Sequence, residues 1–257
     1  MVKKETKEKT ATKEAHPKKA KIGSNWESMK KLILRNPAEA KRRRLREENP
    51  EKSVSPKTLV NLEALLNPDG SGTASDTPVV AIDCEMVGVG PNNESALARI
   101  SIVNYYGAIL YDSFVKPPSA VTDYRTQWSG IRPEDLEGDR VVTLREAQDV
   151  ADRLMKNRIV VGHSISNDFE ALMMHHPRRL IRDTAYYRPF MRKWKNKWLP
   201  HKLQYLLKRE FGTAIQEGEH DSIDDARATL LLYKKYRVEW ENEIKKKEKT
   251  KHRKHGK

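Results

Sequence analysis

The sequence of 257 residues contains a single cysteine, Cys84. One cysteine excludes a disulfide within the chain and any zinc site built from several cysteines. No apolar run approaches the roughly 18 residues that a membrane-spanning helix needs, and the N-terminus shows no hydrophobic signal region. We therefore expect a soluble, intracellular protein with no membrane partner. Because Cys84 lies in an apolar stretch, we expect a core residue there rather than a nucleophile.

Basic residues are scarce in the middle of the chain and abundant at its ends. The net charge is +14, yet residues 1–57 hold 18 Lys and Arg against 8 Asp and Glu, residues 241–257 hold 8 against 3, and residues 58–240 hold 24 against 25. Basic ends suit a polyanionic partner. The composition predicts a basic, largely disordered N-terminal extension (1–57), a linker (58–77), a folded domain (78–240) and a basic C-terminal tail (241–257).

Two short segments outside the central domain have recognisable sequence patterns. KRRRLR at 41–46 is the densest basic cluster and is typical of a nuclear localisation signal. An apolar patch between Leu59 and Leu66 predicts one or two helical turns inside the linker.

The stretch VVAIDCEMVG (79–88) organises the domain. Its Val and Ile content predicts a buried strand, and side chains two apart on a strand share a face, so Asp83 and Glu85 point the same way. Two buried acids need a compensating cation. A divalent metal prefers such oxygens, whereas pairing with Arg or Lys at a strand end is the structural alternative.

The rest of the domain predicts an α/β protein with a mixed sheet flanked by helices. Strands are expected at 98–104, 108–115, 158–163 and 179–186, and helices at 143–156, 166–174, 199–212 and 222–240. Residues 122–136 are expected to be irregular.

Further candidates lie at strand ends and helix starts, where open α/β sheets place their sites. Asp168 and Asp225 each begin a helix, and His220 precedes the second of these. Each has a structural alternative: a helix-dipole contact for Asp168, and a capping box with Ser222 for Asp225. Asp183 is expected to be a cap, and His163 a structural residue.

DCE (83–85), GHSISNDF (162–169) and HDSIDDA (220–226) together resemble the three motifs of the DEDDh 3′→5′ exonucleases. Longer matches over roughly 78–238, including AIDCEMVGVGP (81–91), TDYRT (122–126) and RDTAYYRPF (182–190), resemble the RNA exonuclease 4 family, near the interferon-stimulated 20-kDa exonuclease. The resemblance implies a ribonuclease H-like fold with a mixed five-stranded sheet.

The resemblance also implies the chemistry. Two divalent ions, Mg²⁺ or Mn²⁺, would be held by the four acids, with Asp83 bridging both, Glu85 and Asp225 on one, and Asp168 reaching the other through water. His220 would be the general base. Met86 and Arg125 would lie near the 3′-terminal ribose, where a guanidinium can meet a 2′-hydroxyl.

The resemblance and the basic ends together lead us to expect a monomeric, metal-dependent 3′→5′ exoribonuclease acting on single-stranded RNA. Its expected role is ribosomal RNA precursor processing in the nucleus and nucleolus, with pre-ribosomal proteins as partners. Two alternatives remain open at this point: a non-cleaving RNA-binding ribosome-assembly factor on a nuclease fold, and a 3′→5′ DNA exonuclease.

Overall fold

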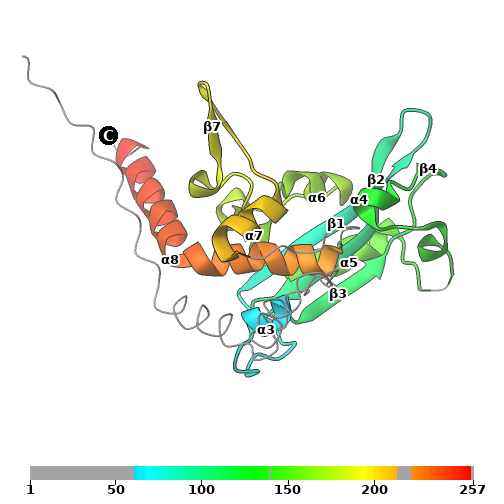
Figure 1. The fold of residues 1–257 in the computed structure, drawn as a ribbon, viewed down its shortest axis with the longest axis horizontal. Coiled ribbons are helices and arrows are strands. Elements are labelled where there is room, and N and C mark those ends of the chain that lie inside the picture. Colours follow the sequence, from blue (N-terminus) through cyan, green and yellow to red (C-terminus); the bar gives the residue numbers. More distant parts are fainter. Residues whose placement is uncertain (1–60, 139, 213–220, 256–257) are drawn as a thin grey trace, which may run out of the picture.

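A computed structural model describes residues 61–138, 140–212 and 221–255. Its main sheet has the order β3-β2-β1-β5-β6, and a short sixth strand, β4, also pairs with β1 (Figure 1). The strands are β1 (Val79–Val89), β2 (Glu94–Asn104), β3 (Ile109–Phe114), β4 (Val121–Asp123), β5 (Ile159–Gly162) and β6 (Ile181–Asp183). β1, β2 and β3 pair antiparallel, whereas β5 pairs parallel with β1 and with β6. The predicted mixed five-stranded sheet is confirmed, with β4 as an addition.

The alternation of side chains along β1 divides the core between the two faces of the sheet. Val79 and Ala81 pack with α3 (Leu62–Leu66), α7 (Leu203–Phe211) and α8 (Ser222–His255). Val80, Ile82 and Cys84 pack on the opposite face with α5 (Leu144–Met155) and α6 (Ser166–Ala171). Asp83 and Glu85 continue the odd-numbered series, so they face α8. This period of two was readable from the sequence because a strand allows no other arrangement.

Local signals explain where two of the helices begin and end. α5 begins at Thr143, which forms a capping box with Glu146: the Thr143 hydroxyl accepts from the Glu146 N–H, and the Glu146 carboxylate accepts from the Thr143 N–H at 2.8 Å. α7 ends at Gly212, whose φ of 70° lies in the left-handed region. The predicted stop at Gly212 is confirmed, but the predicted start at Leu199 was wrong.

Leu199 instead ends a small hairpin that sequence periodicity did not reveal, formed by β7 (Arg192–Trp194) and β8 (Lys197–Leu199). Segment 122–136, expected to be irregular, contains part of β4, the helix α4 (Thr126–Ser129) and a 3₁₀ turn at Pro133–Leu136. These elements are three or four residues long, which is too short to show a periodic pattern.

The expected end of the last helix at Trp240 was also wrong, because α8 continues to His255. Apolar periodicity stops near Trp240, yet Lys and Glu are good helix formers and propagating an existing helix is easy. Glu241 anchors the continuation, because its carboxylate accepts two hydrogen bonds from the buried Arg182 guanidinium at 2.7 and 2.8 Å. Figure 1 shows α8 crossing the sheet and running beyond it.

The helix α3 lies within the segment expected to be a linker. Asn61 caps its first turn, and Leu62 and Leu66 are buried against α8. Lys234 of α8 donates to the Leu66 carbonyl at 2.8 Å, which satisfies a carbonyl at the end of α3. The expected helical turns at this apolar patch are confirmed.

A substitution at Gly107 tests how much the contact with Leu66 of α3 contributes to stability. Its φ is +81°, and an added Cβ would lie 2.7 Å from Leu66 Cδ1. Gly107→Ala is expected to lower the free energy of unfolding by about 1–3 kcal/mol, from left-handed strain and overpacking. Gly70→Ala is the matched control, because Gly70 has a φ of +66° with nothing within 4 Å of the added Cβ. Urea denaturation measures both; equal losses would mean that the Leu66 contact contributes nothing.

Within the described part of the chain, none of the helices combines the length and apolar character needed to cross a bilayer. The structure does not describe residues 1–60, 139, 213–220 and 256–257. His220, the basic cluster at 41–46 and the predicted N-terminal extension are among these residues.

Candidate active site

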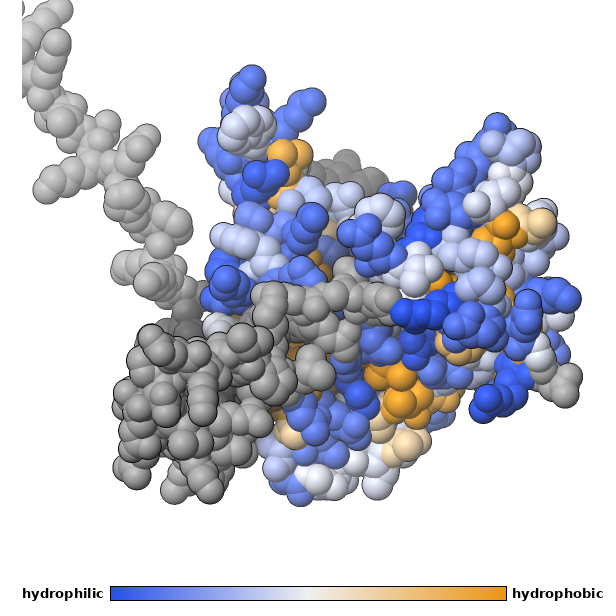
Figure 2. Space-filling model, turned by 45° about the vertical axis from the view of Figure 1, so that its right-hand side comes forward, coloured by the Kyte–Doolittle hydropathy of each residue, from blue (hydrophilic) through white to orange (hydrophobic). Residues whose placement is uncertain are grey.

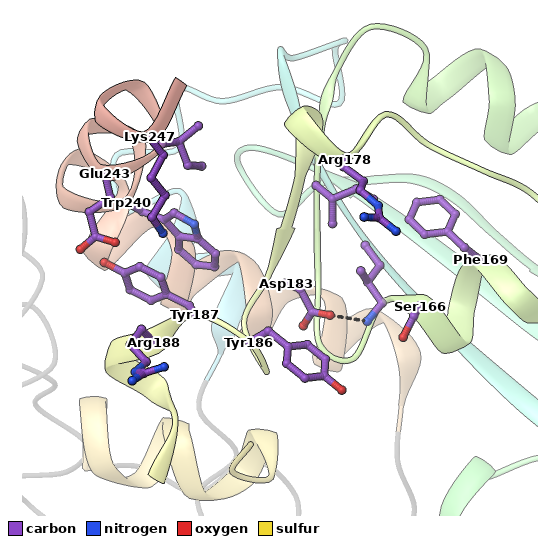
Figure 3. A pocket seen from close by; sticks show the side chains of 13 residues that line it. Ser166, Phe169, Arg178, Asp183, Tyr186, Tyr187, Arg188, Trp240, Glu243 and Lys247 are labelled. Atoms are coloured by element: carbon purple, nitrogen blue, oxygen red, sulfur yellow. Dashed lines mark hydrogen bonds between the residues drawn. The ribbon is translucent and has the colours of Figure 1, made fainter. Parts of the chain in front are cut away.

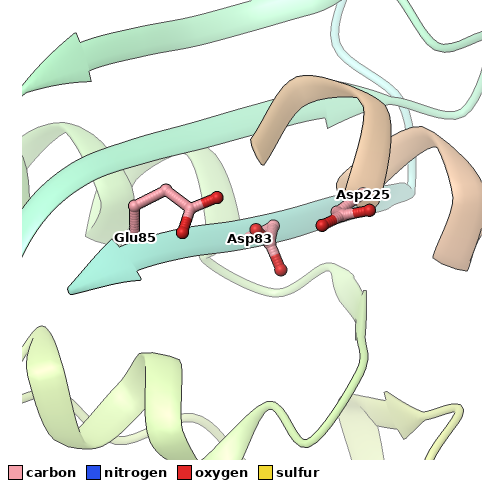
Figure 4. A group of neighbouring side chains, drawn as sticks. All are labelled: Asp83, Glu85 and Asp225. Atoms are coloured by element: carbon pink, nitrogen blue, oxygen red, sulfur yellow. The ribbon is translucent and has the colours of Figure 1, made fainter. Parts of the chain in front are cut away.

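Three carboxylates meet on the α8 side of β1. Asp83, Glu85 and Asp225 each place one oxygen within 4.8 Å of the others (Figure 4). Asp83 and Glu85 come from β1, and Asp225 comes from the first turn of α8. In Figure 4 the three carboxylates follow one another along β1. The sequence prediction that these three acids converge is therefore confirmed as geometry.

The capping-box alternative for Asp225 was wrong, because Asp221 caps the helix. Asp221 Oδ1 accepts from the N–H groups of Ile223 and Asp224 at 3.0 and 3.2 Å. Ser222 does not cap either; its hydroxyl bonds the hydroxyl of Ser101 on β2 at 2.6 Å. Because Asp221 caps the helix, the Asp225 side chain is not needed as a cap and can face β1.

Asp168 lies outside this group of three, beside the edge of β1. β5 pairs with β1 only as far as Ala81, so the backbone of Cys84 no longer has a strand partner on that edge. Asp168, in the first turn of α6, accepts from the Cys84 N–H at 2.8 Å. The fourth acid therefore lies at the carboxyl end of a parallel strand, where open α/β sheets carry their ligands.

Three of these acids have a raised pKa, with burial as the largest cause for each. Burial, followed by the nearby charges of Asp168, Asp225 and Glu85, raises the pKa of Asp83 well above its usual value. Burial, and then Asp225, raise the pKa of Glu85 to about 9. Burial raises the pKa of Asp168 to about 7 despite its hydrogen bonds with Cys84. Without added positive charge, the ionised site is therefore unfavourable.

A cation that the sequence did not single out, Arg99, lies close to Glu85. Arg99 stands opposite Glu85 in the pairing of β1 with β2 and moderates the rise of the Glu85 pKa. Its guanidinium also donates to Asp112 at 2.9 and 3.0 Å and to Asp221 at 3.0 Å. Arg99 thus ties β2 to the start of α8, which positions Asp225. An arginine among the apolar residues of the strand ARISIVN was the signal available in the sequence.

The donor set fits a divalent metal. One Glu85 oxygen, Oε1, is buried without a hydrogen-bond partner in the described residues. An unpaired buried carboxylate oxygen is costly, and a cation would satisfy it. The contributing atoms are carboxylate oxygens, which Mg²⁺ and Mn²⁺ prefer.

The remaining candidates occupy different surroundings. Asp183 accepts from the N–H groups of Ser164, Ile165 and Ala185, so its predicted role as a cap is confirmed. The ring of His163 bonds the Thr184 hydroxyl at 2.9 Å, and burial lowers the pKa of His163 to about 4, which keeps it neutral. This placement is consistent with the structural role expected for it.

Cys84 is buried in the core as expected. Met86 is partly buried and follows a β-bulge at Glu85/Met86, where the pairing of β1 with β2 shifts by one residue. Bulges re-aim side chains beside active sites.

Arg125 has left-handed backbone geometry, with a φ of 53°. Its guanidinium donates to the Ser95 hydroxyl and the Asn93 carbonyl, both at 2.8 Å. It therefore braces the turn between β1 and β2, and its ribose contact stays a prediction. His220 lies outside the described residues, so its role as general base also stays a prediction.

Comparisons with known proteins agree with this geometry. The exonuclease family (RNase T) matches residues 80–233, and the chain belongs to that family. RNA exonuclease 4 of Saccharomyces cerevisiae is 50% identical over 163 residues, covering 63% of this chain and 55% of that protein. Human RNA exonuclease 4 is 45% identical over 168 residues, covering 65% and 39%. The chain spans about half the length of these relatives, and within the exonucleases it belongs to the RNA exonuclease 4 family.

Solved structures show the same fold. The Pan2 pseudoubiquitin hydrolase–RNA exonuclease module of Saccharomyces cerevisiae in complex with A7 RNA superposes with a TM-score of 0.56 at 35% identity, covering 73% of this chain and 33% of that chain. The Pan2 catalytic unit of Neurospora crassa gives a TM-score of 0.56 at 28% identity, covering 68% and 29%. The resemblance seen in the three motifs is therefore confirmed at the level of family and fold.

Proposed function

We propose that this protein is a metal-dependent 3′→5′ exoribonuclease that removes nucleotides from single-stranded RNA. The observation that carries the proposal is the meeting of Asp83, Glu85 and Asp225 within 4.8 Å, beside a Glu85 oxygen that has no partner. In a chain of the exonuclease family, such a site suits phosphodiester hydrolysis. A protein that only binds RNA needs no such concentration of unfavourable acids.

Different residues would bind the metal ions, accept the proton and position the site. Asp83, Glu85, Asp168 and Asp225 would hold two divalent ions, which stabilise charge on the attacking and leaving oxygens of the scissile phosphate. Asp83, the middle carboxylate of the row in Figure 4, would contribute to both ions. His220 precedes α8 by two residues, and its imidazole would take the proton of the attacking water. Arg99 would keep the start of α8, and so Asp225, in position.

RNA as substrate is supported by the basic ends of the chain and by its relatives. Proteins named RNA exonuclease 4 match over most of the domain, and the Pan2 exonuclease module has been solved with RNA bound. Arg125 braces the turn that follows β1, the strand that contains Met86, and further guanidinium N–H groups could meet a ribose 2′-hydroxyl. We extend the proposal to ribosomal RNA precursors, pre-ribosomal protein partners, and action as a monomer in the nucleus and nucleolus. The basic cluster at 41–46 supports the nuclear part.

A degradation assay tests this function. With Mg²⁺, the full chain is expected to shorten a 5′-labelled single-stranded RNA stepwise from its 3′ end, and to degrade the DNA of the same sequence more slowly. EDTA is expected to stop both reactions. Faster degradation of DNA would favour a DNA exonuclease, whereas tight RNA binding without shortening would favour a non-cleaving assembly factor.

A further inference from the structure

Exposed aromatic side chains gather in one short stretch of the chain. Eight large apolar or aromatic side chains are exposed among the described residues, and four of them fall within residues 186–205: Tyr186 (60% exposed), Trp194 (59%), Trp198 (36%) and Tyr205 (49%). Residues 178–209 also hold 11 Lys and Arg against one acid. Rings for stacking bases, interleaved with cations for phosphates, are what single-stranded nucleic acid recognises.

The hairpin of β7 and β8 is the most pronounced part of this surface. In the described sheets these strands pair only with each other. Residues 192–198, RKWKNKW, are all exposed and contain four cations, two tryptophans and no acid. A two-stranded hairpin is marginally stable by itself, and an exposed tryptophan adds little to its stability. Packing within the fold therefore does not explain this sequence, whereas an interaction surface does.

The two tryptophans lie on opposite faces of the hairpin. Trp198 pairs with Lys193, and the Arg188 guanidinium carbon lies 3.5 Å from the centre of the Trp198 ring. This contact attaches the hairpin to the body of the protein and occupies one face of that ring. Trp194 pairs with Lys197 on the other face, and none of the aromatic or cation–π contacts among the described residues involves it. The Trp194 ring is therefore available to stack on a base.

Arg188 also connects the hairpin to a pocket of about 630 Å³ (Figure 3). The pocket lies between α6, β6 and the C-terminal half of α8, and its lining includes Arg178, Tyr186 and Lys247. Asp183 lines it too, but its carboxylate already accepts three backbone N–H groups. A volume of this size accommodates a nucleotide. The pocket and the hairpin therefore adjoin at Arg188, although Glu243 adds an acid to the pocket lining.

The helix α6 connects this surface to the active site. Asp168 of α6 accepts from the Cys84 N–H, whereas Ser166 and Phe169 of α6 line the pocket. Figure 1 shows the β7–β8 hairpin and the turn between β1 and β2 projecting on the same side of the molecule, with α6 between them. Figure 2 shows the two projections with a hollow between them. An RNA strand with its 3′ end at the carboxylates can therefore continue over α6 towards the hairpin.

We propose that the β7–β8 hairpin and the adjoining pocket form a second RNA-binding surface, which holds bases upstream of the 3′-terminal nucleotide. Trp194 and Tyr186 stack bases, while Arg188 and the hairpin lysines bind phosphates. The proposal rests on the proposed function for the direction of the strand. Its consequence is that affinity for RNA depends on length: a long strand reaches the hairpin, and a dinucleotide does not.

Binding measurements on full-length protein carrying Asp83→Asn test this surface without degradation. The probe is a fluorescent single-stranded RNA of about 20 nucleotides, longer than the ~4–16 nucleotides that one such surface covers. Trp194→Ala is expected to weaken binding roughly 10-fold, whereas Trp194→Phe, which keeps a ring, retains it. Replacing Lys193, Lys195 and Lys197 with Ala is expected to flatten the slope of log Kd against log salt by roughly 2.

The matched charge control replaces three exposed cations of α5 and its end, Arg145, Arg153 and Lys156, with Ala. This variant is expected to change neither the Kd nor the slope as the hairpin variant does. An unchanged Kd in Trp194→Ala, or equal losses in the hairpin and α5 variants, would overturn the proposal.

Kinetics with Asp83 intact separate this proposal from the proposed function. Trp194→Ala is expected to raise KM for the long RNA, with kcat unchanged and with no effect on a dinucleotide. Equal effects on both substrates would contradict an upstream contact. If the unsubstituted protein degrades no RNA, the proposed function fails, while the binding experiment still decides whether the hairpin holds RNA.

Discussion

Asp83→Asn is expected to abolish Mg²⁺-dependent degradation of RNA and, in EDTA, to make the protein more stable to heat. Burial, and then the charges of Asp168, Asp225 and Glu85, raise the pKa of Asp83. An amide removes that repulsion and supplies one oxygen ligand fewer. We expect the rate to fall at least about 1,000-fold, the effect of losing several kcal/mol of transition-state stabilisation.

Two readouts distinguish this result from misfolding. The melting temperature of Asp83→Asn in EDTA is expected to rise by a few degrees, about 2–4 °C for each kcal/mol of repulsion removed. Asp152→Asn, at an exposed position of α5, is the control and should alter neither the rate nor the melting temperature. Full activity in Asp83→Asn would show that the Asp83 carboxylate does not act in hydrolysis.

Stabilisation of the protein by Mg²⁺ is expected to grow steeply with pH. The folded-state pKa of Glu85 is raised from 4.5 to about 9, and that of Asp168 from 3.8 to about 7. At pH values between the unfolded and the folded pKa of each group, the folded metal-free protein binds more protons than the unfolded chain. Its stability therefore falls as the pH rises through this window. A metal ion that neutralises the carboxylates removes this loss, by an amount on the order of several kcal/mol near neutral pH.

The difference between melting temperatures in Mg²⁺ and in EDTA is the proper measurement. Some other groups act in the opposite direction; burial lowers the pKa of Lys234 to about 8, for example, which makes stability rise with pH between its folded and unfolded values. Because Lys234 donates to the carbonyls of Leu66 and Tyr105, it acts with or without metal, and the difference cancels its effect. We expect it to be small at pH 5 and large at pH 8, and to shrink in Asp83→Asn. A difference independent of pH would contradict the raised pKa values.

The family and the acids of the candidate site could be recognised from the sequence before any fold was known. Asp83 and Glu85 had to share a face because they are two apart on a strand, and the motif around Asp168 placed a further acid at the end of the next parallel strand. These inferences rest on short-range geometry, which sequence spacing specifies directly.

Other features depended on contacts between residues far apart in the chain. The spacing of Ser222 and Asp225 suggested a capping box, yet Asp221 is the cap, and the difference depends on Ser101 and Arg99 of β2. The hairpin escaped prediction because its strands of three residues show no periodicity, and the extension of α8 escaped it because Glu241 meets Arg182 only in the folded protein.

The order of residues alone determined which side chains can do chemistry here, since alternation along a strand and position at a helix start are local properties. Which acids meet, which one caps a helix and which cation stands beside them were decided by the packing of α8 and α6 around β1. Such contacts join positions more than 80 residues apart, as between Cys84 and Asp168, and no local pattern encodes them.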